Sequence, residues 1–196
     1  DKLHSINEYL LAGDCYQINM AQRFSSQYSG DDWDAYRKLR EANSAPFSAY
    51  LRTQYGAIIS ISPERFLAVK DGQVETKPIK GTRPRKQEPD LDAKMAKELQ
   101  QSTKDRAENL MIVDLLRNDL SKNCLPGSVE VPKLFAIESF PAVHHLVSTI
   151  VGKLKPGCSP LQLLQDAFPG GSITGAPKIR AMQIIEELEP SHRHIY

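Results

Sequence analysis

A lysine in a constrained, basic segment is the strongest candidate for chemistry in this chain. Lys80 lies within Lys77-Pro78-Ile79-Lys80-Gly81-Thr82, where Pro78 restricts the backbone and Gly81 permits close approach of other groups. A lysine amine is a nucleophile only when unprotonated, and burial beside other cations favours that form. The cations close in sequence are Lys77, Arg83 and Arg85. We predict that Lys80 is a nucleophile presented on a turn; a solvated basic loop is the alternative.

Carboxylates in two segments are candidates for metal binding and proton transfer. Glu108 follows Asp105 by three residues on a predicted helix, so the two side chains share a face. Magnesium takes one or two protein carboxylates, and we predict Glu108 as its ligand. Glu64 ends an apolar strand, where partial burial would suit its carboxyl group to general acid work. An ion pair with Arg65 is the alternative for Glu64.

A glycine-rich segment at residues 170–178 has part of the phosphate-loop pattern. Gly170 and Gly175 have the right separation, but Ala176 and Pro177 stand where that loop needs Lys and Ser or Thr. The glycines and the first turn of the following helix still favour a site for a carboxylate or phosphate. A plain helix cap is the alternative.

The elements that must position these residues are predicted as helices mixed with antiparallel strands. Apolar spacing and end signals favour helices at residues 1–11, 31–42, 90–101, 103–116, 160–168 and 176–188. Alternating or β-branched runs favour strands at residues 15–24, 47–51, 57–61, 66–69, 74–77, 128–138 and 145–154. Asp71-Gly72 is a hairpin turn signal, and alternation sends the rings of His144 and His145 to opposite faces. These runs indicate an α+β fold with helices covering sheets.

Composition limits the class of protein and its partners. The chain has 196 residues, 25 basic and 24 acidic side chains and 40% hydrophobic content, enough for one globular core. A net charge of +1 gives no field for nucleic acid, and no apolar run approaches a membrane span. Three widely spaced cysteines favour neither a disulfide framework nor a zinc site, and they point to the cytoplasm. The chain does not begin with Met and stops soon after a helix, so we expect a piece of a longer protein.

Five ordered motifs together resemble the chorismate-utilising enzymes over essentially the whole chain. The motifs are residues 62–66, 78–82, 105–119, 145–148 and 170–178. The resemblance implies a chorismate-binding catalytic domain over residues 1–196, of α+β class, with antiparallel sheets packed together and helices on the outer faces in α/β/β/α layers. It also implies an incomplete copy, lacking an N-terminal domain and the C-terminal part of the catalytic domain.

The residue at position 80 separates activities within the resembled family. Members that make anthranilate or isochorismate typically carry Ala there, whereas members that make 4-amino-4-deoxychorismate, for p-aminobenzoate and folate, carry Lys. The resemblance therefore implies that chorismate and ammonia are converted through a covalent Lys80 adduct, with Glu64 protonating the leaving hydroxyl. Anthranilate or isochorismate synthesis, and an inactive fragment that only binds tryptophan or chorismate, are the alternatives.

The same resemblance implies ligands, partners and further site residues. Mg²⁺ held partly by Glu108 would bind the ring carboxylate, and ammonia would come from a glutamine amidotransferase subunit in a heterodimer. Neither nucleic acid nor a membrane is an expected partner. The residues that match the chorismate pocket are Gly81, Thr82, Ser128, His145, Thr174 and Gly175. The residues that match a pocket for L-tryptophan are Pro46, Phe47 and Ser48.

Overall fold

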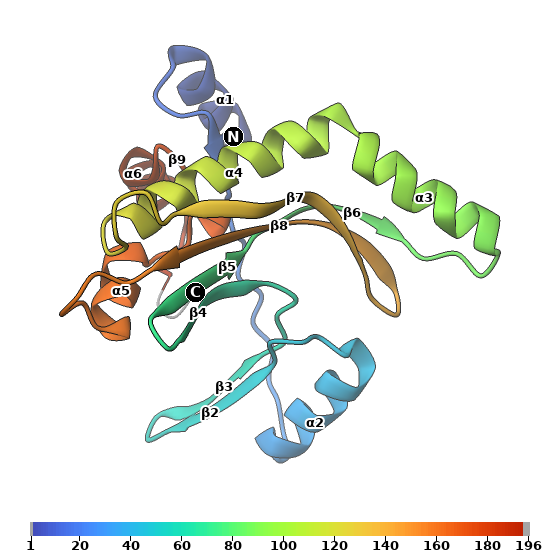
Figure 1. The fold of residues 1–196 in the computed structure, drawn as a ribbon. Helices are drawn as coiled ribbons and strands as arrows, with labels where there is room; N and C mark the ends of the chain where they lie inside the picture. Colours follow the sequence, from blue (N-terminus) through green and yellow to red (C-terminus); the bar gives the residue numbers. More distant parts are fainter. Residues whose placement is uncertain (1, 194–196) are drawn as a thin grey trace. The chain divides into compact units, whose positions relative to one another are not determined.

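The computed structural model describes residues 2–193, and the chain divides into two compact units (Figure 1). Unit 2 comprises residues 24–65, and unit 1 comprises the remainder of the chain. Nothing in the residue pattern indicated this division, because unit 2 has the same mixture of helix and strand signals as unit 1. Within residues 2–193, no helix is both long and apolar enough to cross a bilayer.

Unit 1 is built on a five-stranded sheet that is centred on β8 (Val143–Lys153). β7 (Glu130–Ser139) pairs with β8, as do β5 (Gln73–Lys77) and β6 (Ile79–Pro84) in succession, all antiparallel. β4 (Arg65–Lys70) lies next to β5, on the side away from β8, and forms an edge of the sheet. β6 was not predicted, because its proline, glycine and charged residues have the composition of a loop.

The turn between β4 and β5 confirms the expected hairpin. Asp71 and Gly72 both have positive φ, 51° and 75°. Two consecutive residues with positive φ are what a tight two-residue hairpin of this hand requires, and Asp-Gly provides them at low cost.

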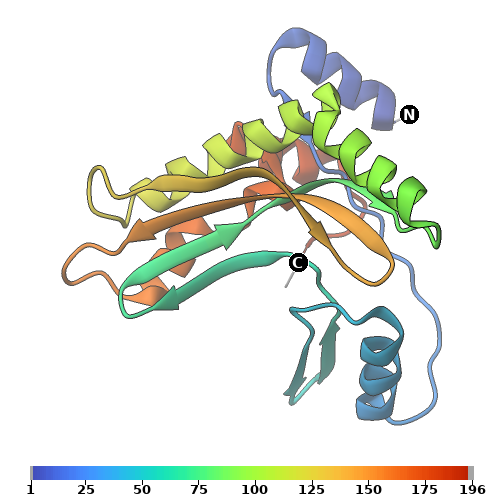
Figure 2. The ribbon, with the colours of Figure 1, turned by 45° about the vertical axis from the view of Figure 1, so that its right-hand side comes forward.

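Three helices cover one face of this sheet: α3 (Pro89–Gln101), α4 (Thr103–Ser121) and α5 (Pro160–Ala167). Figures 1 and 2 show α3 and α4 running over β6, β7 and β8. α4 begins where the Ser102 hydroxyl accepts a hydrogen bond from the Asp105 amide. Its buried apolar residues recur at three- and four-residue spacing and pack with the sheet and α5; the core is Val74, Ile112, Val113, Leu116, Leu120, Cys124, Ile150 and Leu163. The predicted α+β class is confirmed.

A second, small sheet in unit 1 joins the two ends of the chain. β1 (Gln17–Ile18) follows α1 (Lys2–Ala12) and pairs with β9 (Gly175–Ala176), which precedes α6 (Lys178–Leu188). The strand predicted over residues 15–24 is therefore wrong outside Gln17–Ile18. Its alternating pattern is real, but β9 offers only a two-residue partner for backbone pairing.

Unit 2 is a helix with a hairpin. α2 (Asp32–Asn43) is capped by the Asp31 carboxylate, which accepts from the Asp34 amide, and β2 (Ala49–Thr53) pairs antiparallel with β3 (Gly56–Ser60). Three aromatic rings, those of Trp33, Tyr36 and Tyr50, lie with centroids 5.1–5.7 Å apart. This aromatic cluster ties the helix to the hairpin.

Candidate active site

Lys80 lies in a β-bulge of β6, not on a turn as predicted. Ile79 pairs with Val147 and Thr82 pairs with His145, so β6 advances by three residues where β8 advances by two. Gly81 has a φ of +91°, and a Cβ there would lie 2.9 Å from side-chain atoms of Leu99 and Asp105. Glycine is therefore needed both for the conformation and for the contact with the helix layer. The bulge leaves Lys80 outside the regular ladder, in the position in which bulges commonly re-aim a functional side chain.

The half-buried Lys80 amine contacts the glycine-rich segment. Its Nζ donates a hydrogen bond to the Ser172 carbonyl at 3.0 Å. Ser172 belongs to the short 3₁₀ helix η1 (Gly171–Ile173), 92 residues away in the chain. The structure therefore brings together two motifs that the sequence could only place separately.

The cations near Lys80 in sequence are each paired with carboxylates. The predicted electrostatic effect of these cations on the Lys80 amine is not supported, because an ion pair largely cancels the field of its cation. The pairs are Lys77 with Glu138, Arg83 with Glu98 and Asp105, and Arg85 with Asp92.

Close packing accounts for two glycines of the segment 170–178. A Cβ at Gly171 would lie 2.3 Å from Leu115 of α4, and one at Gly175 would lie 2.1 Å from the Gln17 carbonyl oxygen. Gly175 also has a φ of +155°. The buried Thr174 hydroxyl donates to the Gly170 carbonyl at 2.9 Å. Thr174 and Gly175 thus shape the segment from within, and a role in binding chorismate remains a prediction for both.

Lys178 anchors this segment to α4. Its ammonium group donates to Asp119 Oδ2 at 2.5 Å and to the carbonyls of Ala167 and Pro169 at 2.9 and 3.1 Å. The Asp119 side chain is 1% exposed. All three ammonium protons are used, so Lys178 is a structural cation and not an anion receptor.

The two histidines of β8 have different partners, as their alternation predicted. His144 contacts Asp92 of α3 through Nε2 (3.0 Å) and Ser139 through Nδ1 (2.8 Å). His145 Nδ1 lies 2.9 Å from the Thr82 hydroxyl, next to the bulge. Burial lowers the pKa of His145 and thereby favours the neutral imidazole. His145 and Thr82 therefore form a polar pair at the end of the bulge that contains Lys80, whereas His144 is structural.

Glu108 lies on the flank of α4 that faces the glycine-rich segment. Leu115 and Asp119, which contact Gly171 and Lys178, follow it by seven and eleven residues and therefore share its side of the helix. Its side chain is 40% exposed and makes a long 4.0 Å contact to Lys104. No group of three or more potential metal ligands occurs in the described part of the chain. Glu108 is thus available as a single carboxylate ligand.

Ser128 is not brought to this region. Its hydroxyl donates to the Leu125 carbonyl at 2.8 Å and accepts from the Lys153 amide at 3.1 Å, which closes the turn before β7. Lys153 is eight residues from His145 along β8, a separation of about 26 Å in an extended strand. Ser128 therefore cannot share a pocket with His145, and the prediction that it binds chorismate is not supported.

Glu64 and the predicted tryptophan-pocket residues belong to unit 2. Glu64 is half-buried, and its amide donates to the Ser62 hydroxyl at 3.2 Å, which fixes the turn before β4. The Arg65 guanidinium lies 5.0 Å from the centre of the Phe47 ring. Phe47 thus packs under Arg65, a contact that the sequence pattern did not indicate.

A cavity of about 800 Å³ in unit 2 includes two of the three predicted tryptophan-pocket residues, Pro46 and Ser48. The other lining residues were not singled out from the sequence, although the repeated spacing of aromatic and basic residues on α2 was a usable signal. They are Trp33, Tyr36, Arg37, Arg40, Glu41, Ser44 and Ala45. Aromatic walls with basic side chains suit a flat ligand that carries a negative charge.

Comparison with known proteins extends over the whole chain. The chain is 57% identical over 196 residues to aminodeoxychorismate synthase component 1 of Escherichia coli (strain K12), and 43% identical over 194 residues to the protein of that name from Bacillus subtilis (strain 168). It covers 43% and 41% of their lengths, and 100% and 99% of its own. The chain thus spans less than half the length of these relatives.

Solved structures show the same fold. Anthranilate synthase component I from Streptococcus pneumoniae TIGR4 matches with a TM-score of 0.89 and 35% identity, over 100% of this chain and 43% of that one. An isochorismate synthase structure from Bacillus anthracis matches with a TM-score of 0.77 and 25% identity, over 98% of this chain and 53% of that one. The family described as chorismate binding enzyme matches residues 1–196. With the ordered motifs and the fold in agreement, the chain belongs to the chorismate binding enzyme family.

Proposed function

We propose that this chain is part of an aminodeoxychorismate synthase component I, which converts chorismate and ammonia to 4-amino-4-deoxychorismate. The observation that carries the proposal is Lys80, whose amine is presented by a bulge against the glycine-rich segment. The 57% identity to the E. coli component supports it, although the two B. subtilis relatives, one named for aminodeoxychorismate and one for anthranilate synthesis, are 43% and 42% identical and do not separate the two activities.

Lys80 and Glu64 would carry the covalent chemistry. The Lys80 Nζ forms a bond to C2 of the ring while the bond from C4 to its hydroxyl breaks, with the ring electrons shifting between the two carbons. The Glu64 carboxyl group donates the proton that lets this hydroxyl leave as water, and the proton that Nζ loses on bonding to C2 replaces it. Ammonia then bonds to C4 while the bond from C2 to Nζ breaks, and the proton that the ammonia nitrogen loses passes to Nζ, which restores the amine.

The residues beside the bulge would bind and orient the substrate. His145, whose neutral form is favoured, engages Thr82 through one ring nitrogen, so its other nitrogen is the one to offer to a substrate oxygen. Gly81 lets the strand approach closely without a side chain in the way. Thr174 and Gly175 shape the segment that holds the acceptor of Lys80.

Glu108 fits one magnesium ligand. It is a half-exposed carboxylate with a weak partner on the flank that faces the glycine-rich segment, and Mg²⁺ needs only one or two such groups. When bound, Mg²⁺ would offset the charge of the substrate's ring carboxylate.

The expected partners belong to the same proposal. Ammonia would be supplied by a glutamine amidotransferase subunit, in a pathway to p-aminobenzoate and folate in the cytoplasm. L-tryptophan would occupy the cavity in unit 2 that Pro46 and Ser48 line.

The test is product formation from chorismate, an ammonium salt and Mg²⁺, followed by chromatography and mass spectrometry, with Lys80→Ala in parallel. We expect 4-amino-4-deoxychorismate from the parent chain, and an intact-protein adduct with the mass of chorismate minus water when ammonia is left out. Lys80→Ala should form neither. Anthranilate or isochorismate as the product of the parent chain would overturn the assignment. If neither product nor adduct forms, even when the chain is extended to the length of its relatives, the alternative of a protein that binds ligands without catalysis would be favoured.

A further inference from the structure

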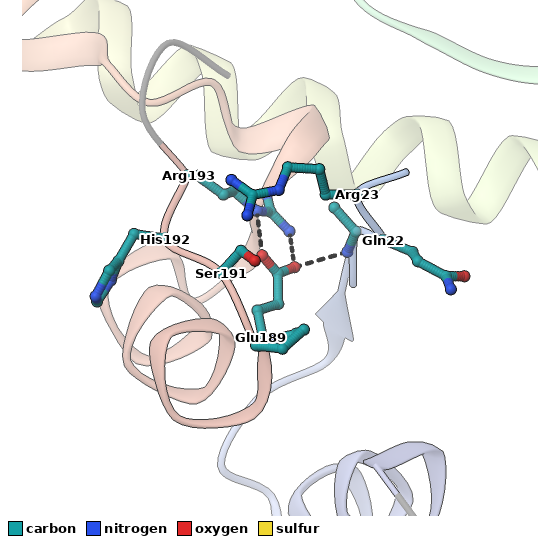
Figure 3. Close-up of a pocket in the computed structure, with 8 residues that line it drawn as sticks. Gln22, Arg23, Glu189, Ser191, His192 and Arg193 are labelled. Carbon is teal, nitrogen blue, oxygen red and sulfur yellow. Dashed lines mark hydrogen bonds and ion pairs between the residues drawn. The ribbon is translucent and has the colours of Figure 1, made fainter. Parts of the chain in front are cut away.

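Arg193 joins three separate segments of unit 1. Figure 3 shows its pairing with Glu189. Arg193 Nη1 donates to the Ile173 carbonyl at 2.6 Å and its Nη2 to the Asn19 carbonyl at 2.5 Å. Its Nε and Nη2 also donate to the two carboxylate oxygens of Glu189, at 2.9 and 2.5 Å. The Ala21 amide donates to the same carboxylate at 2.6 Å. We call this set, Arg193 with Glu189 and the three backbone groups, the arginine clasp.

The side chains of the clasp are largely buried and line two cavities. The side chains of Arg193 and Glu189 are 13% and 5% exposed, and both line cavities of about 470 and 210 Å³. Hydrogen bonds from Arg193 hold the pKa of Glu189 below its usual value. A buried ion pair is a weak source of net stability, because desolvation offsets the attraction between its charges. Its planar guanidinium, however, fixes several acceptors in one geometry, which an apolar pair could not do.

The clasp acts on the peptide that holds Lys80. Ile173 directly follows Ser172, whose carbonyl accepts the hydrogen bond from the Lys80 amine. On the other side of Ser172, Gly171 packs against Leu115 of α4. The Ser172 carbonyl is therefore aimed by anchors on both sides, and Arg193, which follows the C-terminal end of α6, is one of them.

We propose that Arg193 is a positioning residue for Lys80: by fixing the Ile173 carbonyl it sets the direction of the Ser172 carbonyl and thereby the place of the amine. The catalytic value of this arrangement rests on the proposed function of Lys80. The positioning itself does not, so it can be tested without chorismate.

The experiment measures how fast Lys80 is acylated by a limiting amount of acetic anhydride, relative to Lys104 in the same chain, by peptide mass spectrometry. Lys104 is 83% exposed and serves as the internal reference. Arg193→Gln should release the Lys80 amine and raise the ratio about three- to tenfold, the range expected for loss of one hydrogen bond. Arg180→Gln is the matched control, because it removes an ion pair with Asp14 elsewhere on α6 and should leave the ratio unchanged.

Arg193→Lys separates positioning from stability. A lysine ammonium can keep the pair with Glu189 but cannot hold two carbonyls in a planar fork as well. We expect this variant to unfold within a few degrees of the parent chain while its Lys80 ratio rises as in Arg193→Gln. An unchanged ratio in the folded Arg193→Lys variant would overturn the proposal, even if Arg193→Gln fails to fold. A raised ratio in a chain that never forms the chorismate adduct would count against the proposed function alone.

Discussion

Removing the Lys178 ammonium group should destabilise unit 1 far more than removing any surface lysine. Breaking a buried pair costs about 3–5 kcal/mol because a buried charge loses its partner. In Lys178→Met, Asp119 keeps one cation, Lys122 at 3.3 Å, which places this part of the cost at ~3 kcal/mol. The carbonyls of Ala167 and Pro169 also lose their donor, which adds ~1 kcal/mol. We therefore expect a loss of about 4 kcal/mol in the free energy of unfolding.

Urea denaturation followed by circular dichroism and by fluorescence is the assay. With a denaturant slope of about 2 kcal/mol per molar, the midpoint should fall by ~2 M. The single tryptophan, Trp33, lies in unit 2, so its fluorescence reports that unit, and its transition should shift less than the circular dichroism. Lys104→Met removes an exposed lysine with a long contact to Glu108 and should change stability by less than about 0.5 kcal/mol.

A double variant tests the reasoning itself. Adding Asp119→Asn to Lys178→Met removes the stranded charge, so the double variant should be more stable than Lys178→Met by at least about 1 kcal/mol. The explanation would be wrong if the free energy of unfolding of Lys178→Met lies within about 1 kcal/mol of the parent value. It would also be wrong if adding Asp119→Asn lowers the stability of Lys178→Met further, because the stranded Asp119 charge would then not be the cause of the loss.

Three further predictions concern the bulge, the histidine and the cavity. Gly81→Ala should lower the free energy of unfolding by about 2–4 kcal/mol, because of the positive φ and the contacts with Leu99 and Asp105. Gly127→Ala, where φ is +78° and the space around the glycine is open, should lower it by only about 1–2 kcal/mol. Equal losses in urea titrations would show that crowding at Gly81 does not contribute. Because burial lowers the pKa of His145, the unfolded chain binds its proton more readily, so stability should fall as pH decreases from 7 through about 6.5. His145→Gln should flatten that slope and the exposed His4→Gln should not; the same slope in both variants would contradict this cause. In calorimetry, Ser48→Phe should place a ring inside the cavity in unit 2 and weaken L-tryptophan binding at least about tenfold. Unchanged affinity would place any tryptophan site elsewhere.

The sequence predicted the elements whose signals are local. Residues 31–42 carry a capping Asp31 and a periodic apolar face, and α2 occupies Asp32–Asn43. The fold class, the two-residue turn at Asp71-Gly72 and the different surroundings of His144 and His145 followed in the same way from neighbouring residues. β6 was missed because its strand character comes only from its pairing with β8.

Of the candidate site, sequence could identify residue types but not their contacts. The bonds from Lys80 to Ser172 and from Lys178 to Asp119 span 92 and 59 residues, and they exist only because close-packed glycines place one segment against α4. The pairing of the cations near Lys80 depends on α3 lying beside β6 and on β7 lying across β8 from β5 and β6, which no local pattern encodes. Arg193 escaped notice because its acceptors are backbone carbonyls, which carry no sequence signature.

The bulge in β6 makes the chemistry of the side chain at position 80 independent of the backbone pairing that holds the sheet together. Because Ile79 and Thr82 resume pairing on either side, the ladder continues whatever side chain stands between Ile79 and Gly81. A fold with this construction can exchange its reactive group at one position while the surrounding scaffold stays in register. Lys80→Ala should therefore leave the free energy of unfolding nearly unchanged, so a sheet of this kind can serve several chemistries without being rebuilt for each.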